Sequence, residues 1–144
     1  MKNITLPILL FAITFACTSN NQSGNESASG EVSLDSLKSE VLSIHDEVMP
    51  KMGDLRRARK TLMLWADSLV TIDSTKANML STMAEDIANA NESMMVWMRA
   101  YEPDFEGTDE EVRAYLEAQK ESIQKVKDDM ESSLANGLAA TQDQ

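Results

Sequence analysis

The chain of 144 residues has few of the residues on which most protein chemistry depends: one histidine, one cysteine, three prolines and five glycines, with aromatic residues at 5%. A single cysteine cannot form an internal disulfide bond, and a single histidine cannot supply the set of imidazoles that a typical catalytic zinc site uses. The sequence also lacks a nucleophile elbow and a glycine-rich phosphate loop. We therefore expect a protein that is not an enzyme and that holds no cofactor.

Strands are missing from the expected fold as well, because Val, Ile and Thr never gather into runs that alternate apolar and polar residues.

Acidic residues outnumber basic ones by 24 to 13, which gives a formal net charge of −11. Nucleic acids bind to basic surfaces, so this acidity argues against a nucleic-acid partner. It also argues against a helical body that lies on an anionic membrane surface.

Residues 1–16 have the pattern of a signal peptide. A lysine precedes an apolar run over residues 4–15 that is too short to span a membrane stably, and Ala16 and Cys17 follow. The pattern resembles a bacterial lipoprotein signal, which is cut before the cysteine that then carries the lipid, although Thr14 stands where leucine is usual. We expect lipidation of Cys17. The alternative is an ordinary signal, cut near Ala16, that leaves a free thiol.

Residues 17–32 are rich in Ser, Asn and Gly and predict a flexible tether between the lipid and the folded part of the chain. Several acyl chains on one cysteine anchor a protein stably. We therefore expect a location in the bacterial cell envelope, on the periplasmic side of the outer membrane, with the membrane contacted through the N-terminal lipid.

Residues 33–140 carry apolar side chains at alternating spacings of three and four, the pattern of helices packed in a bundle. Three helices are predicted, over residues 33–70, 74–101 and 108–136. The last helix is expected to end at Asn136-Gly137, since glycine often follows a helix. The expected N-caps are Ser33, Asp73 or Ser74, and Thr108, with Glu111 completing a capping box.

Pro50 interrupts the first helical pattern. A proline inside a helix removes one backbone hydrogen bond and costs about 3 kcal/mol or more, yet the apolar spacing continues through it. We expect one long helix kinked at Pro50. Because short loops make neighbouring helices antiparallel, the expected fold is an all-α, antiparallel, up-down-up three-helix bundle. If Pro50 breaks the helix, the alternative is a four-helix bundle.

The first helix is predicted to be about ten residues longer than its partners, or about 15 Å. Leu34, Leu37 and Val41 would then overhang the bundle, unless the 102–108 loop or another protein covers them. This overhang predicts a protein partner or self-association through residues 34–41.

One layer of the expected bundle gathers the chemically distinct side chains around Pro50. They are His45, Met49, Met52, Met94, Met95, Trp97, Met98, Tyr101 and Tyr115. The simpler interpretation is a packed core, in which methionine fills the gap left by a proline kink and the aromatic rings supply apolar bulk. The alternative is a Cu(I) site, because thioether and imidazole ligands suit that ion. The ligands of such a site would be His45, Met49, Met52, and Met94 or Met98.

A basic cluster stands out in this acidic chain. It consists of Arg56, Arg57, Arg59 and Lys60. We expect it to pair with acidic residues at a similar height on the third helix, namely Asp128, Asp129 and Glu131. A binding patch is the alternative.

Three stretches stand out beside the lipoprotein leader. They are His-Asp-Glu-Val-Met-Pro-Lys-Met at 45–52, Met-Met-Val-Trp-Met-Arg at 94–99, and Tyr115-Leu116 followed by Gln119-Lys120 and Ile123. Together they resemble a group of small Bacteroidota lipoproteins that often carry the label "viral A-type inclusion protein", over most of residues 40–134. The label implies coiled-coil-like helices and no activity, so no catalytic residue is carried over.

The sequence thus predicts a lipid-anchored envelope protein that acts as a non-enzymatic binding or structural module. A periplasmic Cu(I)-binding protein is the alternative.

Overall fold

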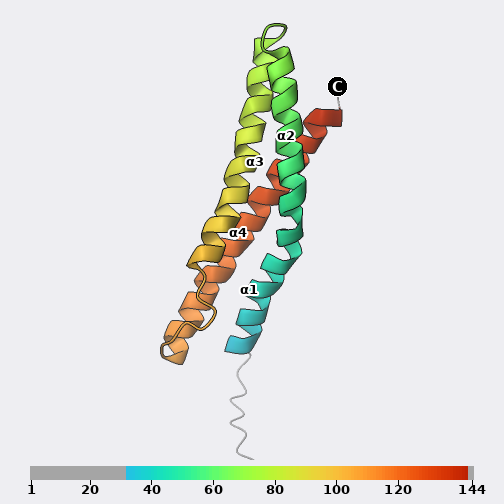
Figure 1. Cartoon of the computed structure of the whole chain (residues 1–144). Helices are drawn as coiled ribbons and strands as arrows, with labels where there is room; N and C mark the ends of the chain where they lie inside the picture. Colours follow the sequence, from blue (N-terminus) through green and yellow to red (C-terminus); the bar gives the residue numbers. More distant parts are fainter. Residues whose placement is uncertain (1–31, 143–144) are drawn as a thin grey trace, which may run out of the picture. The chain divides into compact units, whose positions relative to one another are not determined.

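The computed structural model describes residues 32–142, and every regular element in them is a helix (Figure 1). The elements are α1 (Leu34–Val48), the 3-10 turn η1 (Met49–Lys51), α2 (Met52–Leu69), α3 (Ser74–Ala100) and α4 (Asp109–Gln142). The predicted all-α class is therefore confirmed for this part of the chain. The described residues lie in one compact unit. The predicted signal peptide, Cys17 and nearly all of the predicted tether lie outside the described residues.

Within residues 32–142, none of the helices has the length and the hydropathy that a bilayer span requires.

The first turns of α1, α3 and α4 have the side-chain caps that the sequence predicts. Ser33 Oγ and Asp73 Oδ1 each accept a hydrogen bond from the backbone N–H three residues later, at 3.1 and 3.0 Å. At α4 the Thr108 N–H donates to Glu111 Oε2 at 2.8 Å, and Thr108 Oγ1 accepts from the Glu111 N–H at 3.3 Å. These bonds satisfy N–H groups that the first turn of a helix otherwise leaves without a partner.

The first predicted helix contains one turn of 3-10 helix at Pro50. The proline lies in the first turn of η1, where its missing N–H is tolerated. Hydrogen bonds continue on both sides, because the Met49 N–H donates to the His45 carbonyl and the Met52 N–H donates to the Met49 carbonyl. Val48 and Met52 are both buried. A single 3-10 turn thus stands at Pro50, and the apolar stripe passes through it.

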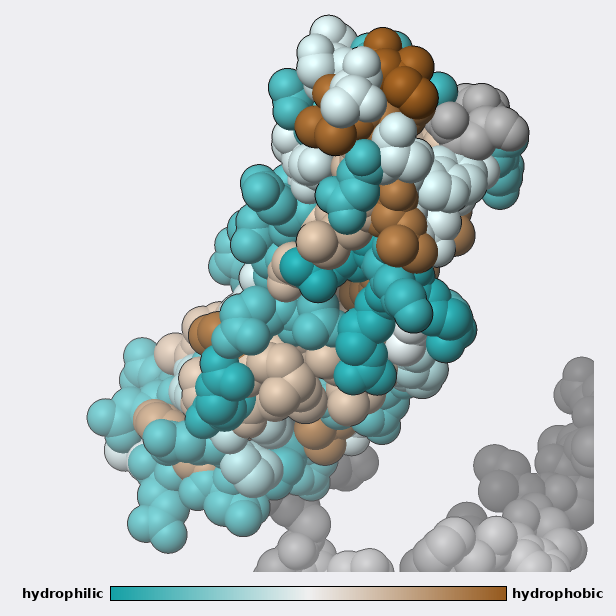
Figure 2. All heavy atoms as spheres, turned by 45° about the horizontal axis from the view of Figure 1, so that its top comes forward, coloured by the Kyte–Doolittle hydropathy of each residue, from teal (hydrophilic) through white to brown (hydrophobic). Residues whose placement is uncertain are grey.

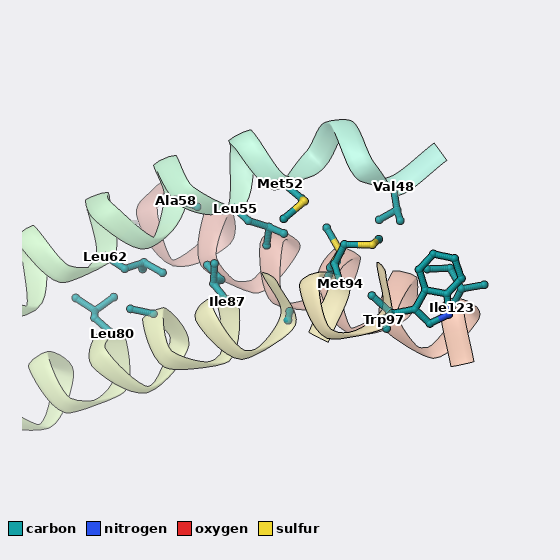
Figure 3. Close-up of a cluster of buried hydrophobic side chains, with 14 of the residues drawn as sticks. Val48, Met52, Leu55, Ala58, Leu62, Leu80, Ile87, Met94, Trp97 and Ile123 are labelled. Atoms are coloured by element: carbon teal, nitrogen blue, oxygen red, sulfur yellow. The ribbon is translucent and has the colours of Figure 1, made fainter. Parts of the chain in front are cut away.

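The helices enclose one continuous apolar core. α2 packs along α3, α1 packs along α4, and α3 and α4 pack on each other. The large side chains that are less than 2% exposed come from all four α-helices: Val41, Val48, Leu55, Leu62, Leu80, Ile87, Met94, Ile123 and Met130. Figure 3 shows several of them pointing into the space between the helices. At about 25 cal/mol per Å² of buried apolar surface, this core is the main source of stability.

Ion pairs join α1 and η1 to α4 at a constant separation of 80 residues along the chain. They are Glu40–Lys120, Glu47–Lys127 and Lys51–Glu131. The Lys127 ammonium, 2.6 Å away and hydrogen-bonded, lowers the pKa of the Glu47 carboxyl, and that carboxylate in turn raises the pKa of Lys127. Partly exposed pairs of this kind add little stability, but together they fix the register of the two helices.

α4 covers α1, so the predicted overhang is wrong. Leu37 is 5% exposed and Val41 is fully buried. The cause is the offset of α4, which is 34 residues long. Near the end of α3, Trp97 borders a surface groove together with Ser122 and Val126 of α4. The end of α3 therefore lies level with Ser122, and the α4 residues before Ser122 extend past α3 and lie along α1.

α4 also continues beyond its predicted end, through Asn136-Gly137 to Gln142. Gly137 is buried, and a Cβ atom built on it would lie 2.8 Å from Ile87 Cδ1 and 3.2 Å from Leu62 Cδ1. The glycine therefore marks a close approach of α4 to α2 and α3 instead of a helix end.

Candidate functional site

Aromatic rings stack in a column that links α1, α3, the 101–108 loop and α4. In order, the rings are His45, Trp97, Tyr101, Tyr115 and Phe105. Successive ring centroids are 5.6, 4.8, 6.3 and 4.3 Å apart, and neighbouring planes are inclined by 29° or less. Rings at these distances attract one another beyond their buried area. We call this group the aromatic column.

The end of α3 places two of the rings. Trp97 and Tyr101 are four residues apart, so that their side chains lie on the same helix face. Tyr101 is the C-cap: its N–H donates to the Trp97 carbonyl at 2.9 Å, while its own backbone is extended, with ψ 124°. The helix therefore stops there while the tyrosine ring stays over Trp97, and Pro103 keeps the following segment out of helix.

Tyr115 in α4 holds the 101–108 loop. Its hydroxyl oxygen accepts a hydrogen bond from the Glu102 N–H at 2.6 Å, and its ring stacks on Phe105 with an inclination of 7°. Phe105 is not among the residues predicted for this layer, because Pro103 and Gly107 on either side of it indicate only that a helix ends. The available signal was an aromatic residue inside an otherwise polar loop.

Some polar atoms of the aromatic column are buried without a hydrogen-bond partner among the described residues, namely Trp97 Nε1 and Tyr101 Oη. Such an atom costs about 1–3 kcal/mol. Burial is the main cause that raises the pKa of the Tyr101 hydroxyl above its usual 10.0, so the ring stays neutral at neutral pH. His45 Nδ1 lies 2.9 Å from Asp46 Oδ1, so its imidazole contacts both a carboxylate and a ring.

The structure separates the methionines that the sequence places in one layer. Met52 and Met94 are 7% and 0% exposed, and Figure 3 shows both pointing into the space between α2 and α3. Met49 is 38% exposed, and Met98 is partly buried. Met130, which lies outside the predicted site, is fully buried in the same core cluster as Met52 and Met94. The predicted copper ligands are therefore divided between core and surface.

No three His, Cys, Asp or Glu side chains converge as a metal-binding group within residues 32–142.

The basic cluster lies exposed on α2 and does not form its predicted ion pairs. Nearer groups engage the acidic residues expected to pair with it: Gln124 with Asp128, Lys125 with Asp129, and Lys51 with Glu131. Arg57 pairs with Asp54 in its own helix. The pairing prediction is wrong because the offset of α4 brings Glu131 beside η1.

Comparison with known proteins adds no relative, since no protein-family model, no curated protein and no solved structure matches the chain. The resemblance to small Bacteroidota lipoproteins therefore stays a prediction.

Proposed function

We propose that the chain is a lipid-anchored protein of the cell envelope, on the periplasmic side of the outer membrane, whose helical unit is a non-enzymatic binding or structural module. The signal-peptide pattern of residues 1–17 supports the anchor, and the aromatic column supports a structural role for the helical unit. This column places the single histidine, His45, in a ring stack 5.6 Å from Trp97 and beside Asp46. Rings used in this way position helices and loops.

The anchor is tested by metabolic labelling of the full chain with a fatty-acid analogue, beside the Cys17→Ser variant. We expect label and membrane association in the wild type, and neither in the variant. A wild-type chain that is cleaved but carries no label would refute the anchor and support an ordinary signal peptide.

For the fold we further propose the up-down-up order, with α1, η1 and α2 acting as one kinked helix bent at Pro50. The constant separation of 80 residues between the partners of the ion pairs supports parallel first and last helices. The four-residue connection between α2 and α3, residues 70–73, supports an antiparallel pair. Self-association through residues 34–41 lacks such support, because the apolar side chains of Leu37 and Val41 are buried.

A periplasmic Cu(I)-binding protein is the second candidate. The observation that favours it is a set of three buried thioethers in one core cluster, from Met52 in α2, Met94 in α3 and Met130 in α4. Thioether sulfur is a soft donor that prefers Cu(I).

Copper binding is tested by titrating Cu(I) into the protein against a competing chelator. Met94→Leu should abolish tight binding, whereas Met49→Leu, at an exposed position, should not. His45→Ala separates the ligand sets: it lowers affinity if the imidazole is a ligand, and lowers only stability if the ring belongs to the packing. Absence of binding in the wild type would leave the methionines as core residues.

A further inference from the structure

Exposed aliphatic side chains gather where α2 meets α3. Five of the ten large hydrophobic residues that are exposed in the described part lie in this short stretch: Met63 43%, Leu64 59%, Val70 60%, Ile72 79% and Met79 46%. Figure 2, which brings this end of the hairpin forward, shows hydrophobic residues gathered on it. A single exposed hydrophobic residue is ordinary, but a group of them marks an interaction surface.

The aliphatic stretch itself, residues 63–79, contains Asp67, Asp73 and Lys76, and four basic residues precede it in α2: Arg56, Arg57, Arg59 and Lys60. Residues 55–79 contain five basic and two acidic residues, a formal charge of +3, whereas the whole chain carries −11, so the remaining residues carry −14. A molecule with this charge distribution turns α2 toward an anionic surface and its other parts away from it. The argument from net charge against an anionic membrane therefore does not hold for α2.

Helical spacing places both features on one face of α2. Arg56, Lys60 and Met63 follow one another at intervals of four and three residues, so they lie along one line of the helix. Leu64 lies one turn beyond Lys60, and Ile72 follows in the turn. All of these side chains are exposed. Basic residues beside aliphatic ones on an exposed helix face are typical of segments that bind the membrane interface.

We propose that this face, formed by Arg56, Lys60, Met63, Leu64, Val70 and Ile72 and called the α2 docking face, binds an anionic lipid bilayer without help from an acyl chain. A bilayer supplies anionic headgroups for the basic residues and an apolar layer for the aliphatic ones. The 70–73 turn ends the hairpin (Figure 1), and Val70 and Ile72 in this turn are 60% and 79% exposed. A soft bilayer accepts such a projection, whereas a second protein would need a matching cavity.

The test uses the chain from residue 17 onward with Cys17→Ser, which contains the whole compact unit and cannot be acylated. Sedimentation with vesicles measures binding to phosphatidylcholine alone and to an equal mixture with phosphatidylglycerol. We expect binding to the mixed vesicles, weaker binding to the neutral ones, and a loss of binding as salt increases. The double variant Arg56→Gln/Lys60→Gln should weaken binding about tenfold or more.

Further variants examine the aliphatic part and the sign of the charge effect. Leu64→Ser/Ile72→Ser should weaken binding to the mixed vesicles by a similar factor. Asp67→Asn should strengthen it, because Asp67 is an acidic side chain exposed on the same side of α2.

Matched control variants on α3 should leave binding unchanged. Arg99→Gln removes one positive charge from a side chain that is 60% exposed, and Val96→Ser removes an aliphatic group that is 51% exposed. Circular dichroism confirms that each variant folds before it is compared.

Equal binding to neutral and anionic vesicles would overturn the proposal, and so would α3 control variants that lose as much binding as the docking-face variants. A third contrary result is a dimer that forms in the absence of vesicles and that the docking-face variants dissociate. The last result would assign the face to a second copy of the chain. Because the protein in this assay carries no acyl chain, the result does not depend on the lipid anchor. If the chain is not lipidated at Cys17, only the labelling experiment will show it.

Discussion

Gly53 and Gly137 both lie within helices, and replacing each of them by alanine separates helix propensity from packing. A Cβ built on Gly53 would meet only Arg57 Nη1, at 3.5 Å. A Cβ built on Gly137 would come within 2.8 Å of Ile87 Cδ1 and 3.2 Å of Leu62 Cδ1. These two neighbours are 1% and 0% exposed, so neither can move aside into solvent.

The two substitutions should therefore have different effects. Alanine in place of glycine stabilises a helix by about 0.5–1 kcal/mol, and Gly53→Ala should show this gain. Gly137→Ala has the same gain, but inserting a methyl group into a packed core costs about 1–3 kcal/mol. We expect Gly53→Ala to be the more stable variant by about 1–3 kcal/mol.

Urea unfolding followed by circular dichroism measures this difference, provided that both variants share the wild-type slope. Gly137→Leu should be less stable than Gly137→Ala, because it adds more volume at the same contact. If Gly137→Ala stabilises the protein as much as Gly53→Ala, then α4 does not pack closely on α2 and α3 beyond Asn136, and the argument for the buried glycine is refuted.

Further predictions concern burial, the loop and pH. Met94→Ala should lower the free energy of unfolding by about 2–5 kcal/mol, since Met94 is 0% exposed. Met49→Ala should change it by about 0.5 kcal/mol or less. Equal losses of the two variants in denaturant unfolding would contradict this difference. Tyr115→Phe should cost about 0.5–1.5 kcal/mol and speed amide exchange at Glu102, whose N–H loses its acceptor; unchanged exchange would contradict the bond. Hydrogen bonds from the α4 N-cap lower the pKa of Glu111 below its usual 4.5, so their stabilisation is present above that pH and is lost as pH falls through the lowered pKa. Glu111→Gln should flatten this acid-side loss, as unfolding measured against pH would show.

The sequence predicts the features that depend on neighbouring residues. The caps at Ser33, Asp73 and Thr108 each need one side chain and a backbone N–H three residues later, and a short motif indicates both. The apolar spacing of three and four likewise predicts the buried faces of the helices. Both signals are local, so the all-α class follows from them.

Features that depend on distant contacts could not be predicted in this way. Asn136-Gly137 has the sequence of a helix end, but the contact of Gly137 with Ile87 is visible only once the helices are packed. Met49 is likewise predicted to share one layer with His45 and Met52, but its side chain is 38% exposed, which only the packed helices show.

The 101–108 loop is the largest such feature. A break with proline and glycine predicts only that one helix ends and another begins. Across this break, Tyr115 accepts a hydrogen bond from the Glu102 N–H and stacks on Phe105. These contacts, like the offset of α4 along α1, appear only once the loop and the helices are packed.

The lipid anchor and the α2 docking face would lie at opposite ends of one helical stretch. α1, η1 and α2 cover residues 34–69, about 54 Å at 1.5 Å per residue, and the predicted tether of residues 17–32 can reach at most about 55 Å. One bilayer could bind both if the exposed line of Arg56, Lys60 and Met63 lay flat on it, but a neutral bilayer lacks the anionic headgroups that these basic residues need. We therefore expect the acylated protein, inserted in neutral vesicles, to cluster added anionic vesicles, and Leu64→Ser/Ile72→Ser to abolish the clustering. Light scattering measures this, and intact binding without clustering would place both contacts on one membrane.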